Sequence, residues 1–222
     1  YLAVAAGKTS TYNGVITDGA ETRAIIKNQT GELILGGNST FKGGVYLDQG
    51  TLTLAHNAGA GTGTIQIGKD TAGTDNAALY ATGGVTIANT LIVRGTNSGT
   101  ATIGSADTTA DNTFSGNLAL NKSATLTAGS GRTVTYSGNI DYLSASKILT
   151  VDGAGNTTIS GALQNALNGG AKLGKMGAGT LTLSGNNAAS AALTLFNLSN
   201  GVVSIASANA IAMAAGGEQW LG

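Results

Sequence analysis

The chain has 222 residues, of which 36 are glycine, and it contains neither proline nor cysteine. Eleven basic residues balance eleven acidic ones, and charged residues make up only 10% of the chain. The lack of cysteine excludes a disulfide scaffold and a Cys-ligated metal site. The low charge excludes coiled coils, helix bundles and the basic surface expected of a nucleic-acid-binding protein.

Short apolar runs follow one another along the chain. Apolar and polar residues alternate within the runs, and Gly, Asn, Asp or Ser stands at their ends, which is the pattern of short β-strands. The Ala-rich stretch 207–215 comes nearest to a helical pattern and predicts one helical turn or a loop. In chain order, strands are predicted at residues 33–35, 45–47, 52–54, 65–67, 85–87, 118–120, 126–127, 134–136, 181–183 and 202–205.

A longer period connects these strands. Gly116, Gly138, Gly161 and Gly185 each end a tripeptide of an apolar residue, Ser and Gly, and they lie 22, 23 and 24 residues apart. A period in the low twenties, made of short strands and turns, is typical of a solenoid in which each repeat forms one coil. The lack of proline agrees with this prediction, because a continuous ladder uses nearly every backbone amide as a donor.

The fold predicted from this period is all-β. We expect a right-handed, single-stranded parallel β-helix of about ten coils, stacked ~4.8 Å apart. Residues 1–222 would form one β-helix segment of a longer chain. A β-sandwich is the alternative, since regularly spaced short strands also describe that fold. A sandwich usually has prolines in its loops and tight Asn-Gly hairpin turns. The solenoid is favoured because this chain has no proline and only three Asn-Gly pairs.

The segment 172–187 reads KLGKMGAGTLTLSGNN. It closely resembles the autotransporter-associated β-strand repeat, and 200–211 would supply its second half. A second copy begins at Lys27, with TGELILGGN at 30–38 and GTLTLAHNA at 50–58. The repeat copies therefore lie near 27–68 and 172–212, and residues 69–171 form more degenerate coils. Ala191 and Ala192 depart from the pattern, which has Gly-Gly at the middle turn.

The resemblance implies a passenger region of a type V secreted protein. Such a region is exported through an outer-membrane barrel, here in a missing C-terminal region, and is displayed at the surface of a Gram-negative bacterium or secreted. The implied function is a non-enzymatic rigid stalk with an adhesin-like surface, whose partners are host or neighbouring-cell surface molecules. The alternative is a self-associating subunit of an extracellular filament or surface layer.

Catalytic and cofactor sites are not predicted. A Ser-His-Asp triad would have to use His56, the single histidine, which stands where a turn is expected. A polysaccharide-active β-helix enzyme is the less favoured alternative, because glycoside hydrolysis needs a pair of carboxylates across a cleft. The candidate carboxylates stand singly in the sequence: Glu32, Asp48, Asp141 and Asp152. The aromatic residues are expected in core or cross-strand packing more than in sugar stacking: Tyr12, Tyr46, Tyr80, Tyr136, Tyr142 and Trp220.

No metal site is predicted, although two acidic pairs are weak calcium candidates. Asp70 and Asp75 flank one polar stretch, and Asp107 and Asp111 flank another. Oxygen ligands on a flexible loop suit calcium, but neither pair has the spacing of a known calcium loop. Both stretches, together with residues 97–104, are interpreted as insertions that protrude from the solenoid. Insertions of this kind often form the binding face of a repeat protein.

Overall fold

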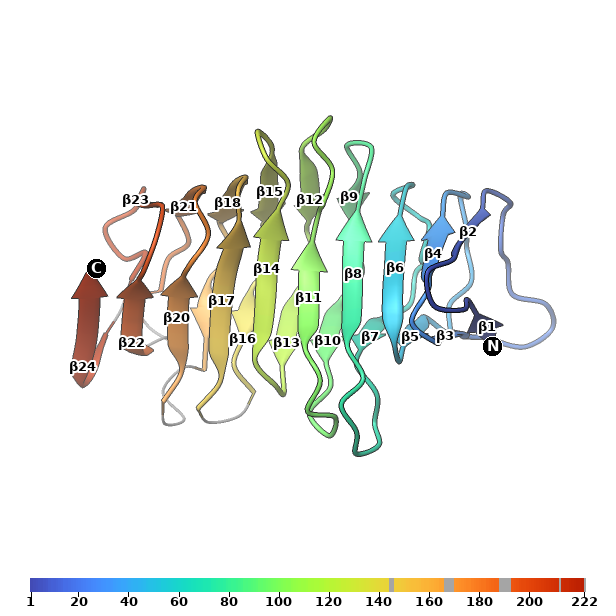
Figure 1. Ribbon diagram of the computed structural model, residues 1–222, viewed down its shortest axis with the longest axis horizontal. Coiled ribbons are helices and arrows are strands. Elements are labelled where there is room, and N and C mark those ends of the chain that lie inside the picture. The colour runs from blue at the N-terminus through green and yellow to red at the C-terminus, as the bar shows by residue number, and fades with distance from the viewer. Residues whose placement is uncertain (144–145, 166–169, 188–192, 212, 222) are drawn as a thin grey trace.

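The structure, a computed structural model, describes residues 1–143, 146–165, 170–187, 193–211 and 213–221, without the side chains of 214–217 and 219–221. The chain winds into three sheets whose strands follow one another along the axis of the molecule (Figure 1). No helix occurs among the described residues. All strand pairs found in them are parallel, so the solenoid prediction is confirmed and the β-sandwich alternative is wrong.

The three sheets are named A, B and C in the order in which the chain reaches them. Sheet A contains β1 (Leu2–Ala3), β3 (Ile25–Asn28), β5 (Val45–Leu47), β7 (Ile65–Ile67), β10 (Leu91–Val93), β13 (Leu118–Leu120), β16 (Ile140–Asp141) and β19 (Leu163–Gln164). Sheet B contains β2 (Thr9–Tyr12), β4 (Glu32–Leu35), β6 (Gly50–Leu54), β8 (Ala77–Ala81), β11 (Ala101–Gly104), β14 (Ala124–Ala128), β17 (Ile148–Gly153), β20 (Lys172–Lys175), β22 (Leu193–Leu198) and β24 (Met213–Leu221). Sheet C contains β9 (Thr86–Ile87), β12 (Asn112–Phe114), β15 (Thr133–Tyr136), β18 (Asn156–Ile159), β21 (Thr180–Leu183) and β23 (Val202–Ile205).

The winding is right-handed. In Figure 1 the strands of sheet B rise at the front, and the chain crosses the top to sheet C at the back. It then descends through sheet A while advancing toward the C-terminus. Right-handed crossovers are the rule for parallel strands because of the twist of the strands themselves. Sheet B has ten strands and sheet A has eight among the described residues, close to the expected number of coils.

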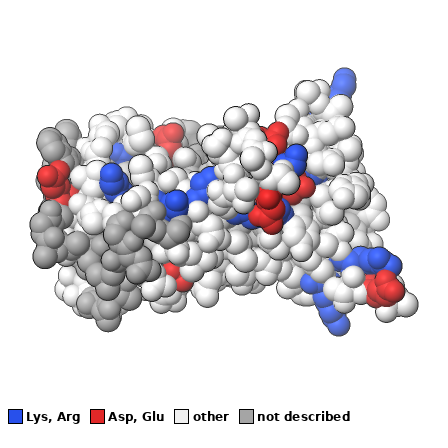
Figure 2. Space-filling model, turned by 90° about the horizontal axis from the view of Figure 1, so that it is seen from below, with Lys and Arg blue, Asp and Glu red and all other residues white. Residues whose placement is uncertain are grey.

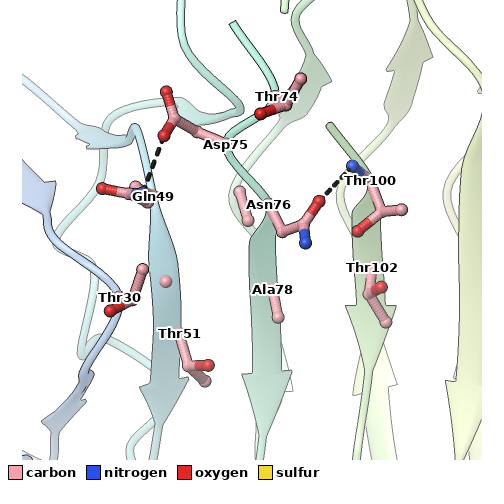
Figure 3. A pocket seen from close by; sticks show the side chains of 11 residues that line it. Thr30, Gln49, Thr51, Thr74, Asp75, Asn76, Ala78, Thr100 and Thr102 are labelled. Atoms are coloured by element: carbon pink, nitrogen blue, oxygen red, sulfur yellow. Dashed lines mark hydrogen bonds between the residues drawn. The ribbon is translucent and has the colours of Figure 1, made fainter. Parts of the chain in front are cut away.

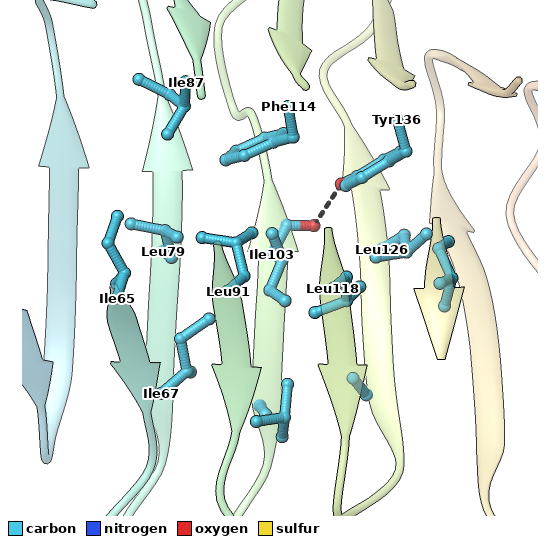
Figure 4. Packing of buried hydrophobic residues seen from close by; sticks show 14 of the residues in the cluster. Ile65, Ile67, Leu79, Ile87, Leu91, Ile103, Phe114, Leu118, Leu126 and Tyr136 are labelled. Atoms are coloured by element: carbon cyan, nitrogen blue, oxygen red, sulfur yellow. Dashed lines mark hydrogen bonds between the residues drawn. The ribbon is translucent and has the colours of Figure 1, made fainter. Parts of the chain in front are cut away.

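Alternate residues of each strand point inward and stack on their equivalents one coil away. Leu52, Leu79, Ile103 and Leu126 form such a column in sheet B, and all four are fully buried (Figure 4). A column of this kind removes apolar surface from water at every coil, at about 25 cal/mol per Å². The period-two pattern of the sequence therefore becomes one continuous core along the axis.

Two aromatic rings interrupt the aliphatic columns of sheet C. Phe114 and Tyr136 are neighbours in register and stack with ring centroids 5.3 Å apart and an interplanar angle of 9° (Figure 4). The hydroxyl of Tyr136 donates a hydrogen bond of 2.8 Å to the carbonyl oxygen of Ile103, which keeps this buried polar group satisfied.

The glycines of the low-twenties period stack on one another at the turn that leaves sheet C. A Cβ added at Gly138, Gly161 or Gly185 would lie well inside van der Waals contact of the carbonyl oxygen of the preceding glycine in the series. Close approach of two backbones is therefore the reason for glycine at these positions. The spacing of this series marks one coil, as the sequence predicted.

The stretch 207–215 contains no helical turn in its described part. Ala208 and Asn209 form a turn, and β24 begins at Met213. The absence of a 3.6-residue apolar pattern explains this outcome, because alanine content alone does not create a buried helical face. Ala191 and Ala192, the departure from the repeat pattern, lie outside the described residues.

Candidate functional site

Depressions lined by described residues lie on the outer face of sheet B, among them the four that follow. The largest, of about 440 Å³, spans β6, β8 and β11 near the corner where the chain enters sheet B (Figure 3). A second, of about 210 Å³, continues beside it over β11, β14 and β17. A third, of about 280 Å³, lies at the opposite ends of β4, β6 and β8, and a fourth, of about 260 Å³, lies over β17, β20 and β22. The outer face of sheet B is therefore the candidate binding surface.

The floor of the first two depressions is one row of small residues. Alternation along each strand turns these side chains outward, and parallel register places each of them beside its equivalent on the next coil. The row combines hydroxyl groups with methyl groups and carries no formal charge. Its members are Thr51, Ala78, Thr102, Thr125 and Thr150.

One wall of the largest depression is a pair of corner loops that hydrogen bonds hold together. Gln49 Nε2 donates to Asp75 Oδ1 at 2.7 Å, and the backbone N–H of Thr100 donates to Asn76 Oδ1 at 2.7 Å (Figure 3). These bonds join three successive coils at the same corner. The loop side chains that border the depression are therefore positioned before any ligand arrives.

A buried guanidinium lies behind this wall. The Arg94 side chain is 7% exposed, and its carbon atom Cζ lies 4.9 Å from the centroid of the Tyr46 ring. Its Nη2 lies 3.4 Å from Asp48 Oδ1 and its Nη1 lies 3.5 Å from Asp70 Oδ2. Nε and Nη2 have no hydrogen-bond partner among the described residues, so the contact with Asp48 is an ion pair without hydrogen-bond alignment.

Charges of both signs balance at this corner. Burial raises the pKa of Asp48, because it penalises the charged form, and the nearby Arg94 opposes that rise. Lys69 Nζ lies 3.7 Å from Asp75 Oδ2. Figure 2, which views the molecule from this side, shows acidic and basic side chains gathered together with mostly uncharged surface around them. The corner therefore stabilises the loops without creating a field of one sign.

The third depression contains two carboxylates that were candidates for different functions in the sequence analysis. Glu32, a candidate of the enzyme hypothesis, and Asp107, a calcium candidate, line it together with Tyr80. Glu32 Oε1 accepts a hydrogen bond of 2.6 Å from the Thr53 hydroxyl. Both carboxylates therefore already accept hydrogen bonds from groups of the protein.

Asp107 is held in its ionised form. The backbone N–H of Gly83 and the hydroxyl of Thr109 hold the pKa of its carboxyl well below the usual range, with further help from Thr82. Burial raises the pKa of Tyr80, and the Glu32 carboxylate adds to that rise. Asp107 therefore accepts hydrogen bonds from its own corner, whereas the proton donor in glycoside hydrolysis is a carboxyl group with a raised pKa.

The other carboxylates of the enzyme hypothesis are dispersed. Asp48 belongs to the Arg94 corner, while Asp141 points outward from sheet A and accepts a hydrogen bond of 2.7 Å from Asn165. Asp152 points outward from β17 in sheet B. His56 lies in the turn after β6, as expected, where its Nδ1 accepts a hydrogen bond from a backbone N–H.

The aromatic candidates divide between core and surface. Tyr136 and Tyr142 are completely buried, and burial raises the pKa of both well above its ordinary value. Tyr46 lies under Arg94 and Tyr80 lies in the third depression. Tyr12 is exposed on β2. The side chain of Trp220 lies outside the described residues.

Each of the four calcium candidates has a protein partner. Asp70 and Asp75 contact Arg94 and Lys69, and Asp111 accepts a hydrogen bond of 2.8 Å from the backbone N–H of Thr133. In the described part of the chain, no three metal-ligating residues gather in one place. The stretches 70–75 and 107–111 protrude from the solenoid, as expected of insertions, and they border the depressions of sheet B (Figure 1). The interpretation of 97–104 as a third insertion is wrong for its second half, because Ala101–Gly104 forms β11 within sheet B.

Two buried lysines, Lys27 and Lys175, and the half-buried Lys122 were not predicted. Lys27 Nζ donates to the carbonyl oxygens of Gln29 at 2.7 Å and Gln49 at 3.0 Å. Lys175 Nζ donates in the same way to Gly177 and to a second carbonyl one coil later. Lys122 Nζ donates to two carbonyls of the preceding coil. Burial lowers the pKa of all three ammonium groups.

The sequence does carry a signal for two of these lysines. Lys27 follows the buried Ile25 by two residues, and Lys175 follows the buried Leu173 by two. Because side chains alternate along a strand, a lysine two positions after an inward residue also points inward. The butylene stem then packs in the core while the ammonium group reaches the polar backbone of the corner.

A scan against protein-family models, a search of curated proteins and a search of solved structures each find no match for this chain. The autotransporter-associated motif therefore rests on the repeat residues alone. In the part of the chain that the structure describes, no helix is long and apolar enough to cross a lipid bilayer.

Proposed function

We propose that this protein is a non-enzymatic, rigid surface module that acts as a stalk and presents an adhesin-like face. The observation that carries the proposal is the parallel sheet B, whose strands follow one another from β2 to β24 with one register shift, between β22 and β24. Ten strands at ~4.8 Å spacing give a rod of about 43 Å along this sheet. A stalk has to hold its length under load, and the ladder provides this property.

Stiffness follows from the way each coil is held. The strands of an inner coil pair with both neighbouring coils, and the inward residues form continuous columns. The stacked turn glycines allow the backbones of successive coils to lie in direct contact at this corner. Bending such a rod would break hydrogen bonds and open the core at the same coil.

The repeat motif supports a more specific proposal. It favours a passenger region of a type V secreted protein of a Gram-negative bacterium, displayed at the cell surface or secreted through an outer-membrane barrel elsewhere in the full chain. Its partners would be surface molecules of a host or a neighbouring cell. The two copies of the motif form equivalent corners, around Lys27 and around Lys175, which supports their interpretation as true repeats.

Electron microscopy of the isolated chain tests the mechanical part of this proposal. Discrete rods of uniform length are expected, and compact particles would contradict it. Cell fractionation of the organism of origin tests the location, since a surface module has to be accessible to protease added to intact cells. Incubation with polysaccharides tests the non-enzymatic part: release of reducing ends would contradict it.

Self-association is a second candidate, and the outer face of sheet C favours it. Five threonines and one serine occupy equivalent outward positions on consecutive strands, so the row is uncharged and repeats at the coil spacing. A second copy has the same spacing, and two such rows could pair coil against coil. Sedimentation velocity at increasing protein concentration separates this candidate from a monomeric stalk. The row consists of Thr86, Thr113, Thr135, Thr158, Thr182 and Ser204.

A further inference from the structure

We infer that the outer face of sheet B binds a neutral, extended polysaccharide that lies along the axis of the solenoid. This inference deepens the proposed function and rests on it, because it names the kind of partner that the adhesin-like face takes. It is carried by the two adjoining depressions over β6, β8, β11, β14 and β17, with their shared floor and their loop wall.

The dimensions of the floor suit a chain of repeating units. Equivalent floor residues lie one coil apart, so the row from Thr51 to Thr150 makes four steps of ~4.8 Å, or about 19 Å. An extended β-linked polysaccharide advances by a similar distance with each sugar. One sugar per coil would therefore place one ring over each floor residue, and five coils would hold about five sugars.

The chemistry of the lining suits a neutral polyhydroxyl ligand. Among the described residues that line the largest depression, none is Lys or Arg, and the carboxylate of Asp75 already binds Gln49 and Lys69. What remains accessible is mostly hydroxyl and amide groups, which both donate and accept hydrogen bonds. Ala78 leaves an apolar, flat space between Thr51 and Thr102, where the C–H face of a sugar ring can pack.

Anionic polymers fit this surface less well. The one lysine that lines the second depression, Lys122, donates to the carbonyl oxygens of Asn97 and Gly99 and is turned into the corner. Arg94 lies behind the loop wall against Asp48 and Asp70. A polyanion would therefore meet no free cation over the first two depressions, and it would lose its hydration without compensation.

A peptide strand also fits this surface less well. Peptides bind to sheets by adding a strand to an open edge, where backbone donors and acceptors are free. The strands under the depressions pair with a neighbour on both sides, as β8 does with β6 and β11. The face consequently offers side chains and not backbone groups, which favours a ligand that carries its own hydroxyl groups.

The wall is already in its binding arrangement. The bonds from Gln49 to Asp75 and from Thr100 to Asn76 fix the loop that contains Asp75 and Asn76 to the corner segments on both sides of it. Binding would then cost little ordering of the protein, which matters because weak sugar contacts have to overcome the entropy of immobilising the ligand.

Isothermal titration calorimetry on the whole chain tests the inference, with cellohexaose and mannohexaose as neutral probes and a galacturonic acid hexamer as the anionic probe. We expect saturable binding of at least one neutral hexasaccharide, and binding of the anionic hexamer at least tenfold weaker. Absence of binding by both neutral probes at millimolar concentration would overturn the inference, as would equal or stronger binding of the anionic hexamer.

A matched pair of variants locates the site. Ala78→Trp fills the floor of the largest depression, while Ala119→Trp places the same side chain at an outward position of sheet A, between Ile92 and Asp141. Both side chains point away from the core, so both variants should fold. We expect Ala78→Trp to weaken binding at least tenfold and Ala119→Trp to leave it unchanged. Equal affinities of the two variants would show that binding occurs elsewhere and would refute the site.

A smaller substitution tests the hydroxyl contacts. Thr102→Val removes one hydroxyl from the floor and keeps the shape of the side chain, and Thr180→Val does the same at an outward position of sheet C outside the threonine row. We expect about fivefold weaker binding for Thr102→Val and no change for Thr180→Val, and the reverse order would contradict the inference. Rods seen by microscopy without any sugar binding would refute this inference alone, whereas compact particles would refute the proposed stalk.

Discussion

The two repeat copies form nearly the same corner at different places around the axis. In the first copy, Lys27 binds the carbonyl oxygen two residues later and that of Gln49, and Gly50 follows with a φ of +78°. In the second copy, Lys175 binds the carbonyl oxygen two residues later and that of Asn200, and Gly201 follows with a φ of +79°. The first corner joins sheet A to sheet B, and the second joins sheet B to sheet C.

This difference shows that the motif specifies a corner and not a face. The lysine cap needs only the backbone carbonyls of two stacked corners, and these occur wherever one strand follows another around the solenoid. The inward lysine ends the strand, a left-handed glycine opens the equivalent corner of the next coil, and an alternating strand follows. A repeat can therefore shift from one face to the next without losing its stabilising contacts.

The largest expected effect comes from the paired glycines of the two corners. A Cβ at Gly50 or Gly201 would clash with two carbonyl oxygens of the preceding coil and would also occupy a left-handed conformation. Gly50→Ala and Gly201→Ala should each lower the free energy of unfolding by about 3 kcal/mol, measured by urea titration.

Gly83→Ala is the matched control for these two variants. Gly83 has a φ of +80°, but no atom lies within 4 Å of an added Cβ. Only the conformational cost of about 1 kcal/mol is expected there. Equal losses for all three variants would show that the contact between coils is not what requires glycine at the two corners.

The second largest effect comes from the lysines themselves. Lys27→Met and Lys175→Met keep the apolar stem but leave three and two carbonyl oxygens, respectively, without their donor. We expect losses of about 3 kcal/mol for Lys27→Met and about 2 kcal/mol for Lys175→Met in the same titration. The exposed Lys8→Met should change stability by less than about 0.5 kcal/mol. A gain in stability for both buried variants would mean that desolvation of the ammonium group outweighs its hydrogen bonds.

The solenoid could be predicted because its causes are local. Alternating residues, turn glycines and the lack of proline can each be recognised within one coil, and each repeats in the next coil. The sheet B floor could not be predicted, because its residues lie 27, 24, 23 and 25 positions apart between Thr51 and Thr150. Loops of different length absorb the extra residues, and the sequence does not say which corner holds each insertion. The inward position of Lys27 was accessible from its spacing to Ile25, whereas its carbonyl partners required the stacking of two coils.

The pH dependence of stability above pH 8 distinguishes the contribution of the three lysines from that of the buried tyrosines. Because burial lowers the pKa of the three lysines, the unfolded chain binds more protons just below pH 10.5, and stability should rise slightly there with pH. Because burial raises the pKa of Tyr136 and Tyr142, the folded chain keeps their protons above pH 10, and stability should fall as pH rises further.

The fall above pH 10 should approach about 1.4 kcal/mol per pH unit for each buried tyrosine. Urea midpoints measured between pH 8 and 11 provide the profile, and Tyr142→Phe should make the fall less steep. A profile that stays flat above pH 10 in the unmodified chain would contradict the burial of both hydroxyl groups.

The smallest expected effect concerns the aromatic rings of the degenerate coils. There the stacked rings of Phe114 and Tyr136 fill sheet C, and the Tyr136 hydroxyl binds the carbonyl oxygen of Ile103. Tyr136→Phe keeps the stacked ring and removes this hydrogen bond, so a loss of about 1 kcal/mol is expected. A loss near 3 kcal/mol, equal to that of Lys27→Met, would show that the middle coils depend on one buried polar contact as strongly as the repeat copies do. A loss near 1 kcal/mol would instead show that packing of the rings stabilises the middle coils more than the hydrogen bond does. An aromatic ring buries a large apolar area with or without its hydroxyl.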